Sequence, residues 1–179
     1  MYGSHTKQSI VIKRGTFEGT LYDINSLVDL PLANMRKLWK IMFDAAWENE
    51  LTISLIRDWL PEKITDTKTR IQQFEDELAR AKADAESKRR AVASWGSELD
   101  NRIKQAKKQL QYAKKSKKAD RIELATGILT TVSQPKTEHD QAVKTVKRTE
   151  SAITTAKAQL EKSEKLQTIF NEMAKTAGI

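Results

Sequence analysis

Over the last two-thirds of the chain, apolar residues recur at alternating steps of three and four positions. Between Ile64 and Leu99 these steps follow an a/d heptad pattern, which is typical of a helix that packs along a seam against another helix. One 4-4-3 interval follows Leu99, and the alternation resumes from Ile103. An interval of this kind relaxes a supercoil without ending the helix. The pattern predicts a long helix over residues 62–115.

A second periodic segment covers residues 137–174, where apolar positions from Val143 to Phe170 mark another seam. Antiparallel pairing of the two segments would bury both seams within one chain, and a short connection favours that topology. A parallel coil between two chains is the alternative. We therefore expect a coiled-coil hairpin over residues 61–179.

The two segments are separated by residues that weaken a helix. Gly127 and the Ser-Gln-Pro run at 133–135 are the main signals. The chain is therefore expected to turn within residues 116–136. A short helix over 120–132, lying across the tip, is the preferred arrangement, and a single helix that turns at 133–135 is the alternative.

Polar residues interrupt the second seam, so part of its apolar surface is expected to remain uncovered. We interpret this surface as a candidate contact for a homodimer. It consists of Leu166, Ile169 and Met173.

The first 60 residues hold seven of the eleven aromatic side chains, which predicts a compact core there. Residues 9–13 are rich in β-branched side chains, Arg14-Gly15 is a turn signal, and residues 16–22 alternate weakly. This pattern predicts a short β-hairpin. The expected fold class is mainly α, with a small α+β head over residues 1–60, made of the hairpin and two helices, followed by the coiled coil.

The first head helix is expected to begin near Pro31, because an apolar stripe at three- and four-residue spacing follows it as far as Ala46. Thr52 resembles an N-cap for a second, short helix over residues 52–60. At these spacings the head tryptophans, Trp47 among them, are interpreted as core residues, with an exposed binding anchor as the alternative. A DNA-binding helix-turn-helix is disfavoured, since the second helix offers few polar side chains to bases.

Charge is distributed unevenly along the chain. The whole formal net charge of +8 lies between positions 102 and 121, where Asp120 is the single acid, while basic and acidic residues are equal in number elsewhere. Such a cluster creates a positive potential that attracts polyanions. The candidate anion-binding residues are Arg102, Lys104, Lys107, Lys108, Lys114, Lys115, Lys117, Lys118 and Arg121.

The residues for catalysis or metal binding are sparse. The sequence has no cysteine and two histidines, His5 and His139. His139 stands between Glu138 and Asp140, but adjacent positions on a helix point in different directions, so we interpret this cluster as part of a helix start capped by Thr137. No Gly-rich phosphate loop, HExxH or GxSxG motif occurs. We expect no enzymatic activity, no cofactor and no metal.

The sequence thus predicts a non-catalytic interaction protein. Its head and hairpin would dock on a larger protein assembly, and the basic tip, near residues 102–136, would meet an anionic surface, as in a regulator, an inhibitor or a virion component. The alternatives are a non-specific nucleic-acid-binding protein that contacts phosphates, and a purely structural coiled coil. No apolar stretch approaches the ~20 residues of a membrane span. A cytoplasmic location is therefore expected, with a virion as the alternative.

Overall fold

The structure is a computed structural model that describes residues 9–11 and 21–179. Two strands, β1 (Ser9–Val11) and β2 (Leu21–Asp23), precede a 3₁₀ helix, η1 (Ile24–Asp29). The remaining elements are helical and are connected by very short turns. They are α1 (Leu32–Asp44), η2 (Ala46–Glu48), α2 (Glu50–Trp95), α3 (Ser97–Ser116) and α4 (Ala119–Ala177).

Contacts between Cα atoms divide the chain into two compact units. We call residues 1–72 with 154–179 the head unit, and residues 73–153 the hairpin unit. The N-terminal part of α2 and the C-terminal part of α4 therefore belong to the head unit. Within the described residues, no helix combines the length and the apolar character that crossing a membrane requires.

The predicted fold class was wrong in its α+β head. Strand structure is limited to the three residues each of β1 and β2, which pair antiparallel with Ile10 opposite Tyr22. Two strands this short cannot form a core by themselves. The core of the described residues is made by helices alone, so the protein is a helical one. The predicted turn at Arg14-Gly15 and the aromatic ring of Phe17 lie outside the described residues.

The head core is formed by the inward-facing sides of η1, α1, α2 and α4. The apolar stripe predicted to follow Pro31 is confirmed, because its residues in α1 face inward. The buried set comprises Ile24, Leu27, Val28, Met35, Leu38, Trp39, Met42, Phe43, Ile53, Ile56, Trp59, Leu60, Leu166, Ile169, Phe170 and Ala174. The stripe expected to remain uncovered for a homodimer is thus part of this core, with Met173 packed against it.

One head tryptophan does not follow the prediction. Trp39 and Trp59 are buried, as expected, but the side chain of Trp47 is 75% exposed. Trp47 lies in η2, at the turn between α1 and α2, where the Asn49 side-chain amide donates a hydrogen bond to the carbonyl oxygen of Ala45 at 3.0 Å. The turn interrupts the helical spacing, and the ring therefore points away from the core.

Helix α2 runs without a break through Pro61, so the separate short helix predicted over 52–60 was wrong, and Thr52 lies inside α2. Proline in a helix interior removes a hydrogen bond and costs about 3 kcal/mol. Leu60 and Ile64 are nevertheless buried on either side of it. We infer that the continuous apolar face, packed in the core, outweighs the local cost.

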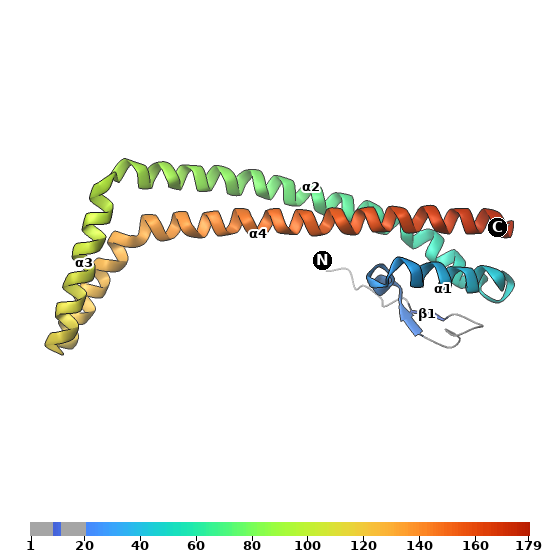
Figure 1. Ribbon diagram of the computed structural model, residues 1–179, viewed down its shortest axis with the longest axis horizontal. Coiled ribbons are helices and arrows are strands. Elements are labelled where there is room, and N and C mark those ends of the chain that lie inside the picture. Colours follow the sequence, from blue (N-terminus) through green and yellow to red (C-terminus); the bar gives the residue numbers. More distant parts are fainter. Residues whose placement is uncertain (1–8, 12–20) are drawn as a thin grey trace, which may run out of the picture. The chain divides into compact units, whose positions relative to one another are not determined.

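In the hairpin unit the long helix predicted over 62–115 is interrupted at Gly96. This residue has φ 53° and ψ −142°, a conformation that side chains with a Cβ rarely adopt. Figure 1 shows that α3 leaves the end of α2 at a steep angle. The buried positions of the predicted seam continue in α3 with Leu99, Ala106 and Ala113.

The chain reverses at Lys117 and Lys118, inside the predicted window. Lys117 adopts the left-handed conformation, with φ 57°, and its N–H donates to the carbonyl oxygen of Lys114 at 3.2 Å. Helix α4 then starts at Ala119 and runs back antiparallel (Figure 1). The helical hairpin is therefore present, but the short tip helix over 120–132 and the alternative turn at 133–135 were both wrong.

Helix α4 passes through both expected breakers, Gly127 and Pro135. Its hydroxyl groups find partners inside the helix, because they donate to carbonyl oxygens one turn earlier; Ser133, for example, donates to the carbonyl oxygen of Leu129 at 2.7 Å. Thr137 does the same to Ser133 at 3.1 Å, so it is a mid-helix residue and not the predicted cap.

Candidate anion-binding surface

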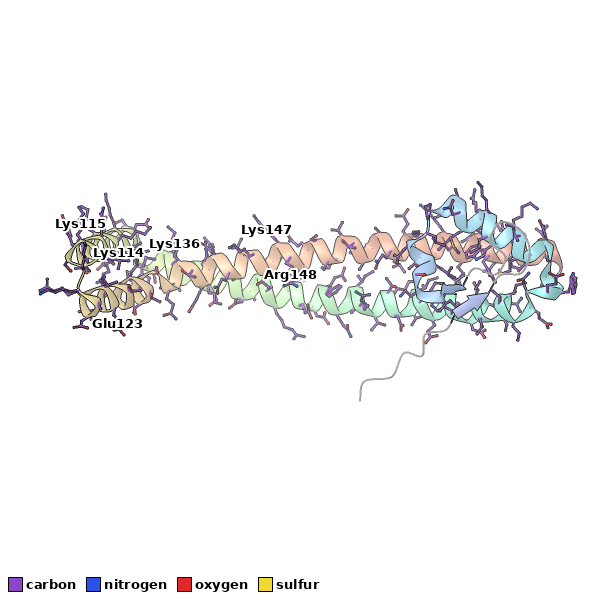
Figure 2. All side chains as sticks on the ribbon, turned by 90° about the horizontal axis from the view of Figure 1, so that it is seen from below. Lys114, Lys115, Glu123, Lys136, Lys147 and Arg148 are labelled. Atoms are coloured by element: carbon purple, nitrogen blue, oxygen red, sulfur yellow. The ribbon has the colours of Figure 1, made fainter. Side chains whose placement is uncertain are left out.

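All nine candidate residues lie in the hairpin unit, near the turn, and all have exposed side chains. Figure 2 shows Lys114 and Lys115 on α3 and Glu123 on α4 at this end of the unit. We call residues 102–136 the hairpin end. Six of the candidates are on α3, two form the turn and one is in the first turn of α4: Arg102, Lys104, Lys107, Lys108, Lys114 and Lys115; Lys117 and Lys118; and Arg121.

The lysines of α3 avoid its packed face. Ala106 and Ala113 are buried, and the 100° step of a helix places Lys104, Lys108 and Lys115 on the opposite side. Neighbouring lysines at i, i+4 repel each other on a helix surface. These lysines repel one another and do not pack in the core, so they destabilise the isolated fold.

The helix ends partly offset this repulsion. Lys114 and Lys115 lie in the last turn of α3, and Asp120 lies in the first turn of α4. Cations are favoured at a helix C-terminus and anions at an N-terminus, typically by 0.3–1 kcal/mol. The two helix termini thus stabilise the charges of Lys114, Lys115 and Asp120, while these side chains remain exposed to solvent.

Arg102 differs from the other eight candidates. Its guanidinium Nη2 lies 2.6 Å from Glu98 Oε1, and its Cζ lies 5.2 Å from the centroid of the Trp95 ring. These contacts hold Arg102 near the α2–α3 junction. We therefore assign it a structural role.

The eight remaining cations have no carboxylate within ion-pair distance in the described part of the chain. Elsewhere in the hairpin unit, Lys82 pairs with Glu150 across the two helices at 3.0 Å. Hydrogen bonds from Arg89, and then Arg90, lower the pKa of Glu86 to about 2. Some charges along the helices thus form ion pairs, and the net positive charge lies at the hairpin end, since basic and acidic residues are equal in number elsewhere in the chain.

Helix α4 supplies little negative charge to this end. Between residues 122 and 135, Glu123 is the single charged side chain. At the base of the hairpin end, Lys136 Nζ lies 3.2 Å from Asp100 Oδ1, and a shallow groove beside this pair is lined by Ile103, Lys104 and Lys107. The groove is open and shallow, which suits a surface contact better than a small ligand.

Sequence reasoning missed an apolar component of the same surface. Tyr112 on α3 is 71% exposed and Leu124 on α4 is 68% exposed, and Ile128 follows Leu124 at i+4. Leu124 and Ile128 belong to neither predicted seam. The i, i+4 spacing of Leu124 and Ile128 indicates a second apolar face on this helix. This spacing was overlooked, because a break was expected near Gly127.

The described residues contain no group of three His, Asp or Glu side chains arranged to hold a metal ion. His139 is half-buried in the middle of α4, with Nδ1 3.7 Å from Asp140 Oδ1. The arrangement offers a charged and partly apolar surface for binding.

Comparison with protein-family models, curated proteins and solved structures finds no match to this chain.

Proposed function

We propose that this protein is a non-catalytic interaction protein that binds an acidic protein surface through its hairpin end. The observation that carries the proposal is the set of eight exposed cations with no carboxylate partner among the described residues. Pairing these charges with a partner breaks no ion pair within the fold, because none of them forms one among the described residues. Their mutual repulsion is relieved when an anionic partner binds.

A protein partner is favoured over a nucleic acid by the apolar side chains beside the lysines. Protein interfaces combine an apolar centre with a charged, solvent-exposed rim. Tyr112 and Leu124 provide such a centre. Phosphate contacts alone would not require an exposed leucine.

Non-specific nucleic-acid binding is the second candidate, and it is favoured by the predominance of lysine over arginine. Lysine contacts phosphates as a point charge and carries little base specificity. Seven of the eight unpaired cations are lysines, Arg121 being the other.

The test replaces Lys114, Lys115, Lys117 and Lys118 by Gln. A matched control replaces four exposed cations elsewhere: Lys37, Lys144, Lys147 and Arg148. Binding to poly-glutamate, to a random duplex DNA and to a single-stranded RNA is measured over a range of salt. We expect the hairpin-end variant to lose most of its affinity for poly-glutamate and the control to lose little.

The outcome separates the candidates. If nucleic acid binds far more tightly than poly-glutamate, and the salt slope falls by roughly 0.7–0.9 per lost phosphate contact, the partner is a nucleic acid. If neither variant changes any binding, the hairpin end is only a solvated surface and the proposal fails.

A further inference from the structure

The large exposed apolar side chains fall into two groups. In the described residues there are eight of them, and none lies along the intervening parts of α2 and α4. One group belongs to the head unit and the other to the α3 region of the hairpin unit. They are Trp47, Leu51, Leu55 and Ile179 in the first, and Trp95, Tyr112, Leu124 and Ile128 in the second.

The first group forms a patch on the outer side of α2, which we call the head patch. Leu51 is 83% exposed, and Leu55 follows it at i+4, on the side of α2 opposite the buried Ile56. Beside Trp47, a cavity of about 500 Å³ extends between α2 and the chain near Ile179. Isolated exposed apolar residues need no explanation, but adjacent ones beside a cavity indicate a binding surface.

The head patch is surrounded by negative charge. Residues 47–62 contain four carboxylates and a single basic residue, Arg57. Arg57 also lines the cavity. Three of the four have exposed side chains and the fourth is half-buried. They are Glu48, Glu50, Asp58 and Glu62.

The two groups are complementary in charge and alike in apolar content. The head patch carries exposed leucine and tryptophan within an acidic border. The hairpin end carries exposed tyrosine and leucine beside eight unpaired cations. A partner suited to the head patch must therefore be basic, with protruding apolar side chains, and this chain itself has such a segment.

We propose that the head patch binds the hairpin end of a second copy of this chain. The inference rests on the proposed function, because it names the acidic surface that the hairpin end recognises. Contacts between two different surfaces are heterologous, so each copy keeps one free head patch and one free hairpin end. Association therefore continues into open chains of copies, or closes into a ring.

The contact is expected to depend strongly on salt and concentration. Its apolar part is only a few side chains on each surface, and the remainder is electrostatic attraction. Screening shortens the range of that attraction from about 10 Å at 0.1 M salt to about 3 Å at 1 M. Assembly should be present at low salt and absent at high salt.

The test uses two full-length variants with changes confined to exposed side chains. The head-blocked variant carries Glu50→Gln, Leu51→Ser and Glu62→Gln. The end-blocked variant carries Lys114→Gln, Lys115→Gln and Lys118→Gln. Far-UV circular dichroism checks that both keep the helix content of the unchanged protein, and sedimentation velocity at low salt measures assembly.

We expect the unchanged protein to sediment faster as its concentration rises, and each variant alone to remain a monomer. An equimolar mixture of the two should form a dimer and nothing larger, because the dimer retains only the blocked head patch and the blocked hairpin end. A monomeric unchanged protein at all concentrations, or a mixture that does not associate, overturns the inference.

Failure of this inference can be told from failure of the proposed function. The head-blocked variant keeps an intact hairpin end, so it should still bind poly-glutamate. If it binds while the unchanged protein is monomeric, the hairpin end has another acidic partner. If a synthetic Lys/Leu amphipathic peptide shifts the backbone amide NMR signals of Trp47 and Leu51 in that monomeric protein, the head patch binds a basic segment of a different protein, which also overturns self-association.

Discussion

The rings of Trp39 and Phe170 meet edge to face, with their centroids 5.4 Å apart and their planes at 80°. Phe43 also contacts Phe170, at 5.2 Å between centroids. Trp39 and Phe43 belong to α1 and Phe170 to the end of α4, so the head core depends on a segment far away in the sequence. We infer that residues 1–60 alone do not form a complete core.

Trp39→Ala and Phe170→Ala should each destabilise the head unit by about 3–5 kcal/mol, as is usual for aromatic side chains removed from a core. In the double variant the losses should not add, because the ring pair itself contributes roughly 0.5–1.5 kcal/mol. Denaturant unfolding measures all three variants. Additive losses would show that the two rings are energetically independent.

Trp39→Phe should cost much less than Trp39→Ala. Trp39 Nε1 is buried with no hydrogen-bond partner in the described structure. An unpaired buried donor is itself unfavourable by about 1–3 kcal/mol, and phenylalanine removes it while retaining most of the ring. A loss equal to that of Trp39→Ala would indicate that the indole nitrogen is paired in solution.

Gly96 and Gly127 form a matched pair for substitution by alanine. Gly96 has a positive φ, so Gly96→Ala should destabilise the hairpin unit by about 1–3 kcal/mol. Gly127 lies inside α4 with nothing within 4 Å of the position of a Cβ, so Gly127→Ala should stabilise it by about 0.5–1 kcal/mol. Thermal unfolding compares them. The same sign for both would mean that α2 and α3 are not separated by a glycine turn.

The seams were predictable because burial in paired helices follows a fixed period. Ile64, Ile71 and Leu99 are buried as the a/d pattern requires, and so are Ile153 and Ala156 on the returning helix. The stripe of α1 was predictable for the same reason. These features depend only on local spacing, which a sequence displays directly.

The ends of the helices were less predictable. Gly96 and Gly127 look alike in the sequence, yet only Gly96 ends a helix. Glu98 and Asp100 after Gly96 are the acids of a helix start, and they were the missed signal. Lys117 adopts a left-handed conformation that its residue type does not indicate.

The exposed apolar surfaces could not be predicted from spacing. Trp47 lies four residues after the buried Phe43, as core residues of a helix often do, but a turn between α1 and α2 redirects it. Only the packing of α4 on the head decides which side of α2 is covered. The location of the cations at the chain reversal, in contrast, was predicted within the correct window.

The pKa of Glu86 offers a test of the charge balance along the helices. Hydrogen bonds from Arg89 and Arg90 lower it from 4.5 to about 2, with the Arg89 bond the larger cause. A lowered pKa stabilises the fold at pH values above 4.5, and this contribution is lost as the pH falls from there through about 2. Arg89→Gln should raise the pKa of Glu86 more than Arg90→Gln does. Carboxyl-carbon NMR titration measures it, and equal effects would contradict the assigned geometry.

The most direct test of the central claim is to locate where a polyanion contacts the protein. The sample is the head-blocked variant, which is expected to remain monomeric. Its backbone amide NMR spectrum is recorded while poly-glutamate is added at low salt. We predict shifts concentrated at residues 104–121, with little change at Lys144, Lys147 and Arg148, although those side chains are also exposed and basic. Shifts spread evenly over all basic positions, or confined to the head unit, would contradict the account.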